Sequence, residues 1–281
     1  MPRLRITKVE KTCVDTLVEA YEKYSPQVSL FKEQLLMALT SAERLNQHVH
    51  SIGSRLKDPA HLRDKLIRKM LGKTDQSPFD VSTDNLLTKI NDLVGVRILH
   101  LYTRQIPHID KALREIFEEN QYQLMEGPFA RTWDDESRTF FRELGIETQE
   151  SPSMYTSVHY VIGSASRTRV TAEIQVRTLM EEVWGEVDHA LNYPYKTNSL
   201  ACAEQLKVLA RVTSSATRLV DSIFLTMEHH PRDAILLTEG DLSATGPNSD
   251  TPTRSVRKRH RVVSVRRKRR RRLGKPGAHR G

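Results

Sequence analysis

The sequence predicts an α/β (α+β) fold, a mixed β-sheet of about five strands flanked by helices, with helical segments at both ends. Runs rich in β-branched residues at 93–99, 155–162 and 169–177 predict strands. Segments with the helical period of 3.6 residues precede, separate and follow these runs. Beyond residue 230 both patterns stop, so the packed part of the chain is expected to end there.

Charge divides the chain into two parts. Of the 44 Lys and Arg residues, 14 lie in residues 251–281, which contain no Asp or Glu. Residues 1–250 therefore hold 44 − 14 = 30 basic residues against 35 acidic ones, a net charge of −5. The basic tail follows a stretch at 240–253 that lacks core-forming side chains and is expected to be a linker. A tail of like charges repels itself and is expected to be disordered when alone.

Composition also excludes several protein classes. The chain has 38% hydrophobic residues and no apolar run near the roughly 18 residues that a membrane span requires. Its N-terminus lacks the apolar core of a signal peptide. Cys13 and Cys202 have neither CxxC spacing nor histidine neighbours, which argues against disulfides and a structural zinc site. We therefore expect a cytoplasmic protein that does not contact a membrane.

Helix signals are clearest in the first third of the chain. Helical periodicity covers residues 10–24 and 28–49, and a short strand is expected at 48–52. Asp58 followed by Pro59 predicts a helix start, because aspartate caps free amides and proline suits the first helical position.

Three further helices are expected, at residues 106–120, 178–191 and 200–227. Residues 121–153 are poor in periodicity and punctuated by glycine and proline, so part of this stretch is expected to be a mobile loop. In the last helix, apolar spacing gives the core candidates Leu206, Leu209, Leu219, Ile223 and Phe224.

Cations and a carboxylate surround the predicted helix start and the first β-branched run. Arg55, Lys57 and Lys65 lie on either side of the helix N-terminus, which itself favours phosphate through free amides and the helix dipole. Asp92 precedes the strand from which Arg97 projects. Each of these residues alone is more often a surface or capping residue, so their significance depends on the combination.

The segment AEIQVRTL carries the most informative pattern. Alternation turns Ile174 and Val176 to one face of a strand, and Glu173, Gln175 and Arg177 to the other. A carboxylate among β-branched residues has to be solvated or paired. The polar face is therefore either a solvated surface or the wall of a pocket.

Tyr155 and His159, in MYTSVH, add an aromatic ring and an imidazole to these candidates. Two acids, several cations and an aromatic ring are typical of a magnesium–nucleotide site, where the metal binds one or two carboxylates together with phosphate oxygens.

Four motifs occur in order along the chain: SRLKDPAHLRDKL, DLVGVRI, YTSVHYV, and EIQVRTL followed by EEVWGEVDHALNYPYK. In these motifs the chain resembles the synthetase domain of the RelA/SpoT family, the alarmone synthetases. The resemblance covers residues 51–196 and implies a nucleotidyltransferase-like synthetase core there. Helical periodicity predicts an N-terminal helical segment at 1–50 and a C-terminal helix at 197–230, and composition predicts a disordered linker with the basic tail at 231–281.

The family implies an enzyme that moves the β,γ-pyrophosphate of ATP to the 3′-hydroxyl of GDP or GTP, giving ppGpp or pppGpp. Its cofactor is Mg²⁺, which Asp92 and Glu173 would hold. Glu173 would also take the proton from the attacking hydroxyl.

The remaining site residues divide between the two substrates. Arg55 and Arg97 would sandwich the adenine between planar guanidinium groups. Lys57 and Lys65 would bind the ATP phosphates. The acceptor side would consist of Tyr155, which stacks on the base, and of His159 and Gln175, which position the phosphates or the ribose.

One departure from the family pattern affects the acceptor side. Many alarmone synthetases have a glycine directly before the stacking tyrosine, where this chain has Met154. A side chain there changes how the loop can turn. The preceding segment FRELGIETQE is also acidic on balance, whereas the family often supplies cations there for the acceptor phosphates.

Three functions therefore stay open. The first is a small alarmone synthetase that acts on GDP or GTP. The second is a toxin-type relative that pyrophosphorylates the 3′ CCA end of tRNA or makes adenosine alarmones; an antitoxin partner and an RNA contact through the basic tail at 254–280 stay open with it. The third is an inactive nucleic-acid-binding protein on a synthetase scaffold, against which the intact acidic and basic motif residues argue.

Overall fold

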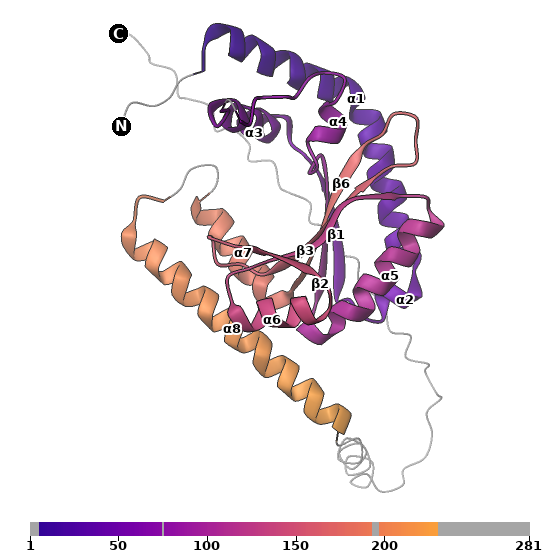
Figure 1. The fold of residues 1–281 in the computed structure, drawn as a ribbon, viewed down its shortest axis with the longest axis vertical. Helices are drawn as coiled ribbons and strands as arrows, with labels where there is room; N and C mark the ends of the chain where they lie inside the picture. The colour runs from indigo at the N-terminus through magenta and orange to yellow at the C-terminus, as the bar shows by residue number, and fades with distance from the viewer. Residues whose placement is uncertain (1–5, 75, 193–196, 230–281) are drawn as a thin grey trace, which may run out of the picture.

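A six-stranded mixed sheet forms the centre of the molecule (Figure 1). The computed structural model describes residues 6–74, 76–192 and 197–229, so the predicted linker and basic tail lie outside it. The expected α/β (α+β) fold is confirmed, with six strands where about five were expected. In their order across the sheet the strands are β1 (Ser51–Leu56), β2 (Val94–His100), β6 (Thr171–Thr178), β5 (Ser157–Gly163), β3 (Gln123–Thr132) and β4 (Glu147–Glu150).

Helices cover both faces of this sheet, with α1 and α5 on one side and α7 and α8 on the other (Figure 1). The two helical patterns near the N-terminus belong mainly to one long helix, α1, which contains Pro26. Within the described ranges, no helix is long and apolar enough to cross a membrane. The helices are α1 (Lys8–Ser41), α2 (Glu43–Asn46), α3 (Pro59–Leu71), α4 (Leu86–Lys89), α5 (Ile106–Glu119, after the 3₁₀ turn η1, Thr103–Gln105), α6 (Asp135–Glu143), α7 (Leu179–Asn192) and α8 (Leu200–His229).

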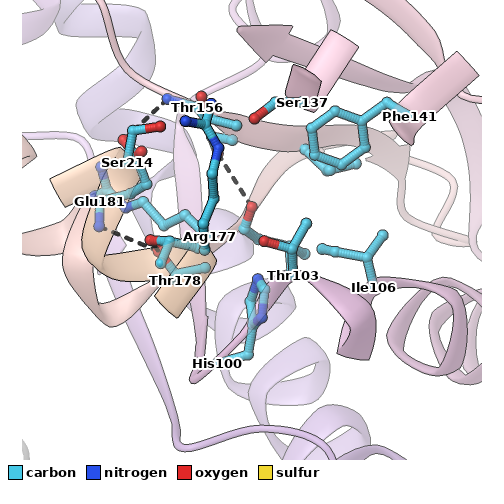
Figure 2. A pocket seen from close by; sticks show the side chains of 15 residues that line it. His100, Thr103, Ile106, Ser137, Phe141, Thr156, Arg177, Thr178, Glu181 and Ser214 are labelled. Atoms are coloured by element: carbon cyan, nitrogen blue, oxygen red, sulfur yellow. Dashed lines mark hydrogen bonds between the residues drawn. The ribbon is translucent and has the colours of Figure 1, made fainter. Parts of the chain in front are cut away.

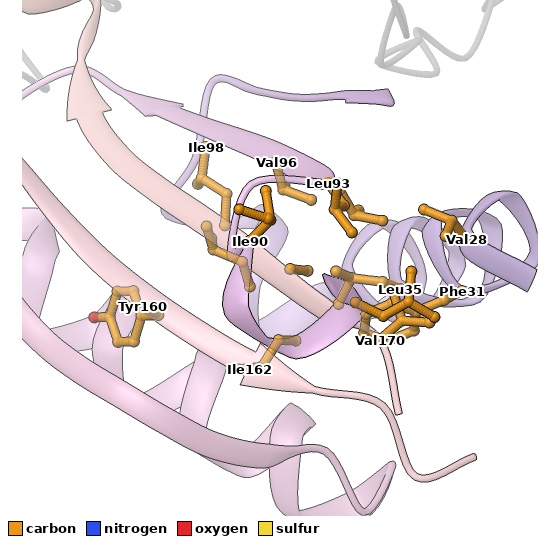
Figure 3. Packing of buried hydrophobic residues seen from close by; sticks show 14 of the residues in the cluster. Val28, Phe31, Leu35, Ile90, Leu93, Val96, Ile98, Tyr160, Ile162 and Val170 are labelled. Atoms are coloured by element: carbon orange, nitrogen blue, oxygen red, sulfur yellow. The ribbon is translucent and has the colours of Figure 1, made fainter. Parts of the chain in front are cut away.

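Alternation in the central strands separates a packed face from a polar one. Val96 of β2 pairs with Ile174 of β6, and both are buried in the core. Figure 3 shows Phe31 and Leu35 of α1 beside Val170, in the same cluster of buried residues as Val96. The expected orientation of AEIQVRTL is therefore confirmed, and Glu173 points to the opposite face.

The expected start of α3 is confirmed by its cap. The Asp58 carboxylate accepts hydrogen bonds from the backbone N–H groups of Ala60 (2.8 Å) and His61 (3.4 Å), and Pro59 occupies the first turn. Because these amides are already bonded, this helix end does not offer them to phosphate, contrary to the sequence-based expectation. Phosphate binding at this point has to rely on nearby side chains.

The expectation of loop structure holds for only a small part of residues 121–153, because β3, α6 and β4 fill most of this stretch. Pairing between β3 and β5 shifts register between Leu124 and Glu126, and again between Glu126 and Phe129. These irregularities break the alternation from which a strand is predicted. β4 is a four-residue polar strand at the sheet edge, which gives no hydrophobic signal.

The expected C-terminal helix exists as α8, but its predicted core face is partly wrong. Leu206 is buried, whereas Leu219 and Ile223 are 63% and 49% exposed. Leu209 and Phe224 are half-buried. The face that α8 turns toward the domain contains small polar residues instead: Thr213, Ser214 and Thr217.

Candidate active site

A cleft of about 1040 Å³ opens on the polar face of the sheet, beside α1, α3 and α7. It brings together motif residues that are far apart in the sequence. Six of the nine predicted site residues line it: Arg55, Lys57, Asp92, Arg97, Glu173 and Gln175.

Strand register explains why these residues meet. Arg55 pairs with Gly95 across β1 and β2, and Gly95 pairs with Glu173 across β2 and β6. In the next row, Arg97 pairs with Gln175. A Cβ on Gly95 would lie 3.4 Å from Arg55 Cγ, so the arginine side chain crosses the sheet over this glycine. Gly95 is a site residue that the sequence-based selection missed, although a glycine inside a strand often marks such a close approach.

Asp92 is held by the two lysines that were predicted to bind phosphate. Lys65 Nζ lies 2.7 Å from Asp92 Oδ1, and Lys57 Nζ pairs with Asp92 Oδ2. Burial disfavours the charged carboxylate, but the two lysines outweigh it, so the pKa of Asp92 lies below its usual value. Asp92 is therefore ionised at neutral pH and already surrounded by positive charge.

Glu173 is the second carboxylate of the cleft. Its Oε1 lies 2.9 Å from Nδ1 of His159, a side chain that is 1% exposed. Burial opposes ionisation of Glu173, and the hydrogen bond and charge of His159 overcome this effect, so the pKa of Glu173 is lowered. The negative charge of Asp92 acts on Glu173 in the opposite direction, which indicates that the two carboxylates are close enough to interact.

The chemistry of this pair suits a hard divalent cation that keeps most of its water ligands. Mg²⁺ is commonly bound in proteins through one or two carboxylates together with substrate phosphates. In the described part of the chain, no group of three or more His, Cys, Asp or Glu residues is arranged to hold a metal. Asp92 and Glu173, whose charges interact in this cleft, are carboxylates that could hold Mg²⁺ together with substrate phosphates.

Arg97 is fixed by carboxylates of α7. Its Nη1 lies 2.9 Å from Glu182 and 2.5 Å from Glu186, and Glu182 also pairs with Arg177 at 2.6 Å. Ion pairs in the plane of a guanidinium leave its faces open for stacking. The two glutamates were missed in the sequence, although their spacing of four residues in EEVWGE places them on one side of a helix.

Tyr155 lies outside the cleft and is connected to it through His159. The Tyr155 hydroxyl lies 3.4 Å from His159 Nε2 and 3.4 Å from a guanidinium nitrogen of Arg131. One face of the tyrosine ring stacks on Trp184, with 6.2 Å between centroids and an angle of 14° between planes. Tyr155 and His159, two residues predicted to bind the acceptor, thus form an aromatic pair next to Glu173. Arg131 adds a cation that none of the sequence motifs contains.

Two further side chains line the cleft that the sequence did not single out. Tyr21 of α1 donates a hydrogen bond from its hydroxyl to the Lys57 carbonyl oxygen at 2.7 Å. Arg68 of α3 adds a further cation to the lining of the cleft. The long N-terminal helix therefore contributes directly to the shape of the site.

Comparison with known proteins finds similarity both in sequence profile and in fold. A family profile described as a region found in RelA / SpoT proteins matches residues 54–198, just over half of the chain. A solved structure of a GTP pyrophosphokinase family protein from Streptococcus pneumoniae is similar, with 20% identity, a TM-score of 0.53, and coverage of 75% of this chain and 94% of that one. No curated protein sequence matches the chain.

Two structures of small alarmone synthetase 1 from Bacillus subtilis are also similar. One has 18% identity, a TM-score of 0.55, and coverage of 75% of this chain and 99% of that one. The other, bound to its product pppGpp, has 20% identity, a TM-score of 0.51, and coverage of 73% and 94%. At this level of identity the likeness shows a shared fold.

Proposed function

The chain belongs to the RelA/SpoT family, and on that premise we propose that it transfers the β,γ-pyrophosphate of ATP to the 3′-hydroxyl of GDP or GTP. The observation that carries the proposal is the pair of ionised carboxylates, Asp92 and Glu173, in one cleft with Lys57, while Lys65 pairs with Asp92 from beside it. Small alarmone synthetase 1 from Bacillus subtilis has been solved with pppGpp and with AMPCPP, ligands that correspond to a guanosine product and an ATP analogue.

Asp92 and Glu173 would hold Mg²⁺ in this cleft. When bound there, the ion would neutralise charge on the ATP phosphates as a Lewis acid. Both carboxylates are ionised at neutral pH because their pKa values are lowered, so they require no deprotonation to act as ligands.

ATP would lie along the cleft from the arginines to the lysines. Arg55 and Arg97 present guanidinium planes that stack on an adenine ring. Lys57 and Lys65 would exchange their ion pairs with Asp92 for ion pairs with phosphate oxygens. This exchange is a small movement because lysine is a long, flexible point charge.

Glu173 would act as the base. The acceptor 3′-oxygen attacks the β-phosphorus, the bond from that phosphorus to the α,β-bridging oxygen breaks, and AMP leaves. The proton of the hydroxyl passes to Glu173, whose carboxylate His159 holds in place at 2.9 Å. Gln175 and His159 would orient the acceptor, and Tyr155 would stack on its base.

The test is a transfer assay with purified protein, ATP labelled in the γ-phosphate, and Mg²⁺. GDP, GTP, AMP and deacylated tRNA are offered as separate acceptors. We expect label on GDP or GTP, and a loss of several orders of magnitude for Asp92→Asn and Glu173→Gln with folding intact. Glu228→Gln, on the exposed end of α8, is the matched control and should keep full activity.

The assay separates the alternatives. Label on tRNA alone would identify a toxin-type acceptor, and label on AMP an adenosine alarmone synthetase. An absence of transfer to every acceptor, with wild type equal to Glu173→Gln, would contradict the proposal and favour a binding protein.

A further inference from the structure

The Tyr155 loop, defined as residues 151–156, carries the proposed acceptor contact from β4 to β5. Its first half is closed by two local hydrogen bonds. The Ser151 carbonyl oxygen accepts from the Met154 N–H at 2.9 Å, and Ser151 Oγ accepts from the Tyr155 N–H at 3.3 Å. These bonds shape the turn, but they do not attach it to the helices behind the site.

The second half of the loop is attached to α7. The Thr156 N–H donates to Oε2 of Glu181 at 3.0 Å, and Thr156 Oγ1 lies 3.0 Å from Thr132 Oγ1 of β3. Among the backbone hydrogen bonds that the structure describes for this loop, the bond from the Thr156 N–H has an ionisable acceptor, Glu181. The strength of this bond therefore depends on whether the Glu181 carboxylate is protonated, which would not be so for a neutral acceptor.

The Glu181 side chain is buried and its backbone is held in place by a hydrogen bond. Its own N–H donates to Thr178 Oγ1 at 3.2 Å in the first turn of α7. It lines a cavity of about 40 Å³, in whose wall Figure 2 shows Glu181 near Thr156 and Ser214. This volume exceeds the roughly 10–15 Å³ that one water requires, so water can exchange protons with the carboxylate.

The groups that face Glu181 come from several elements. Burial raises the pKa of Glu181 to about 7, and the charge of Asp134 adds to this, against the Thr156 N–H and Arg177. On the α8 side, Arg218 is paired with Asp134. On the β2 side, burial lowers the pKa of His100 to about 4, so this ring stays neutral. Within the described lining of the cavity, Glu181 is thus the group placed to change charge near neutral pH.

We propose that Glu181 is a positioning residue for the acceptor side, and that protonation of its carboxylate loosens the Tyr155 loop. A hydrogen bond to an ionised acceptor is roughly twice as strong as one to a neutral acceptor. Loss of this strength at Thr156 frees the neighbouring Tyr155, whose ring stacks on Trp184 three residues after Glu181 on α7. The importance of the loop for an acceptor nucleotide rests on the proposed function, whereas the coupling itself does not.

Trp184 provides a readout that needs no nucleotide. The chain has two tryptophans, so Trp133→Phe leaves Trp184 as the sole emitter. In this background we expect Trp184 emission to change in one transition with a midpoint near pH 7. Glu181→Gln should remove the transition, because its amide oxygen still accepts the Thr156 N–H but does not titrate. Glu143→Gln, at the exposed end of α6, is the matched control and should keep it.

Two results would overturn the inference. One is flat emission across neutral pH; the other is a transition that persists in Glu181→Gln, which would assign it to another group. If Glu181→Gln does not fold, Glu181→Asp replaces it. The shorter carboxylate should move the midpoint, and an unchanged midpoint would again contradict the coupling.

Steady-state kinetics test whether the Tyr155 loop affects acceptor binding. We expect the KM for GDP to rise several-fold as the pH falls through 7 while the KM for ATP stays constant, and Glu181→Gln to abolish this dependence. If the Trp184 transition depends on Glu181 but no acceptor is labelled, the proposed function fails and the coupling stands. If transfer occurs without the Trp184 transition, the coupling fails and the function stands.

Discussion

Gly185 of α7 lies directly against the guanidinium of Arg177 on β6: a Cβ on Gly185 would stand 2.7 Å from Arg177 Nη1. The Arg177 side chain is 7% exposed and pairs with Glu182 at 2.6 Å. Glu182 in turn holds Arg97 at 2.9 Å. A glycine inside a helix is about 1 kcal/mol less favourable than alanine. Here it makes room for the arginine that connects the sheet to the helix facing the cleft.

Gly185→Ala should therefore weaken ATP binding while changing the free energy of unfolding little. Alanine gains about 1 kcal/mol of helix propensity, which offsets much of the clash with Arg177. The displaced guanidinium weakens the ion pairs that fix Arg97, so we expect the KM for ATP to rise roughly three- to tenfold. Ala190→Gly, elsewhere on α7, is the control: it should lower stability by about 1 kcal/mol and leave the KM unchanged. An unchanged KM in Gly185→Ala would show that this network does not support ATP binding.

Met154 holds a left-handed backbone, with φ of 61°, directly before Tyr155. Such a conformation costs a non-glycine residue about 1–2 kcal/mol, while glycine loses about 0.5–1 kcal/mol through the entropy of the unfolded chain. Met154→Gly should thus be neutral or stabilising by up to about 1 kcal/mol. Met154→Val should be destabilising, because β-branched residues tolerate this region poorly. Urea unfolding midpoints measure both, and equal losses in the two variants would refute the assignment of strain.

Helix α8 has one buried and one exposed leucine whose contributions to stability can be compared. Leu206→Ser removes a buried side chain and should lower the free energy of unfolding by about 2–5 kcal/mol. Leu219→Ser changes a side chain that is 63% exposed and should alter it by no more than about 0.5 kcal/mol. Thermal or urea unfolding compares them directly. A large loss for Leu219→Ser would mean that this face is covered in solution.

Much of the fold and the site could be predicted where local rules dominate. The cap at Asp58 and the alternation around Glu173 both follow from neighbours within a few residues, and both expectations hold in the structure. β3 was not predicted because its register shifts interrupt the alternation from which a strand is recognised. The polar inner face of α8 was not predicted because the hydrogen-bond partner of the Ser214 hydroxyl is Asp134, 80 positions earlier in the chain.

Asp134 joins α6 to α8 and should make stability depend on acid. Burial disfavours its charge, but the Ser214 hydroxyl (2.8 Å), backbone N–H groups and Arg218 outweigh this, so its pKa lies below the ordinary aspartate value of 3.8. A carboxyl with a lowered folded-state pKa stabilises the fold above pH 3.8, and this contribution is lost as the pH falls through the folded-state pKa.

Asp134→Asn tests this contribution. The variant should lose roughly 1–3 kcal/mol at neutral pH, since it leaves a buried network with a weaker partner. Its free energy of unfolding should also fall less steeply than that of wild type below pH 3.8. Denaturant titrations at several pH values measure both effects. Parallel pH curves for the two proteins would place the acid sensitivity elsewhere.

The most direct test of the proposed chemistry is to count AMP, ADP and labelled acceptor in the same reaction with ATP, Mg²⁺ and GDP or GTP. Pyrophosphate transfer predicts one AMP for each acceptor labelled, no ADP formed with it, and loss of both products in Asp92→Asn. ADP formed together with labelled acceptor would mean transfer of a single phosphate. Unchanged turnover in Asp92→Asn would contradict the role of the two carboxylates.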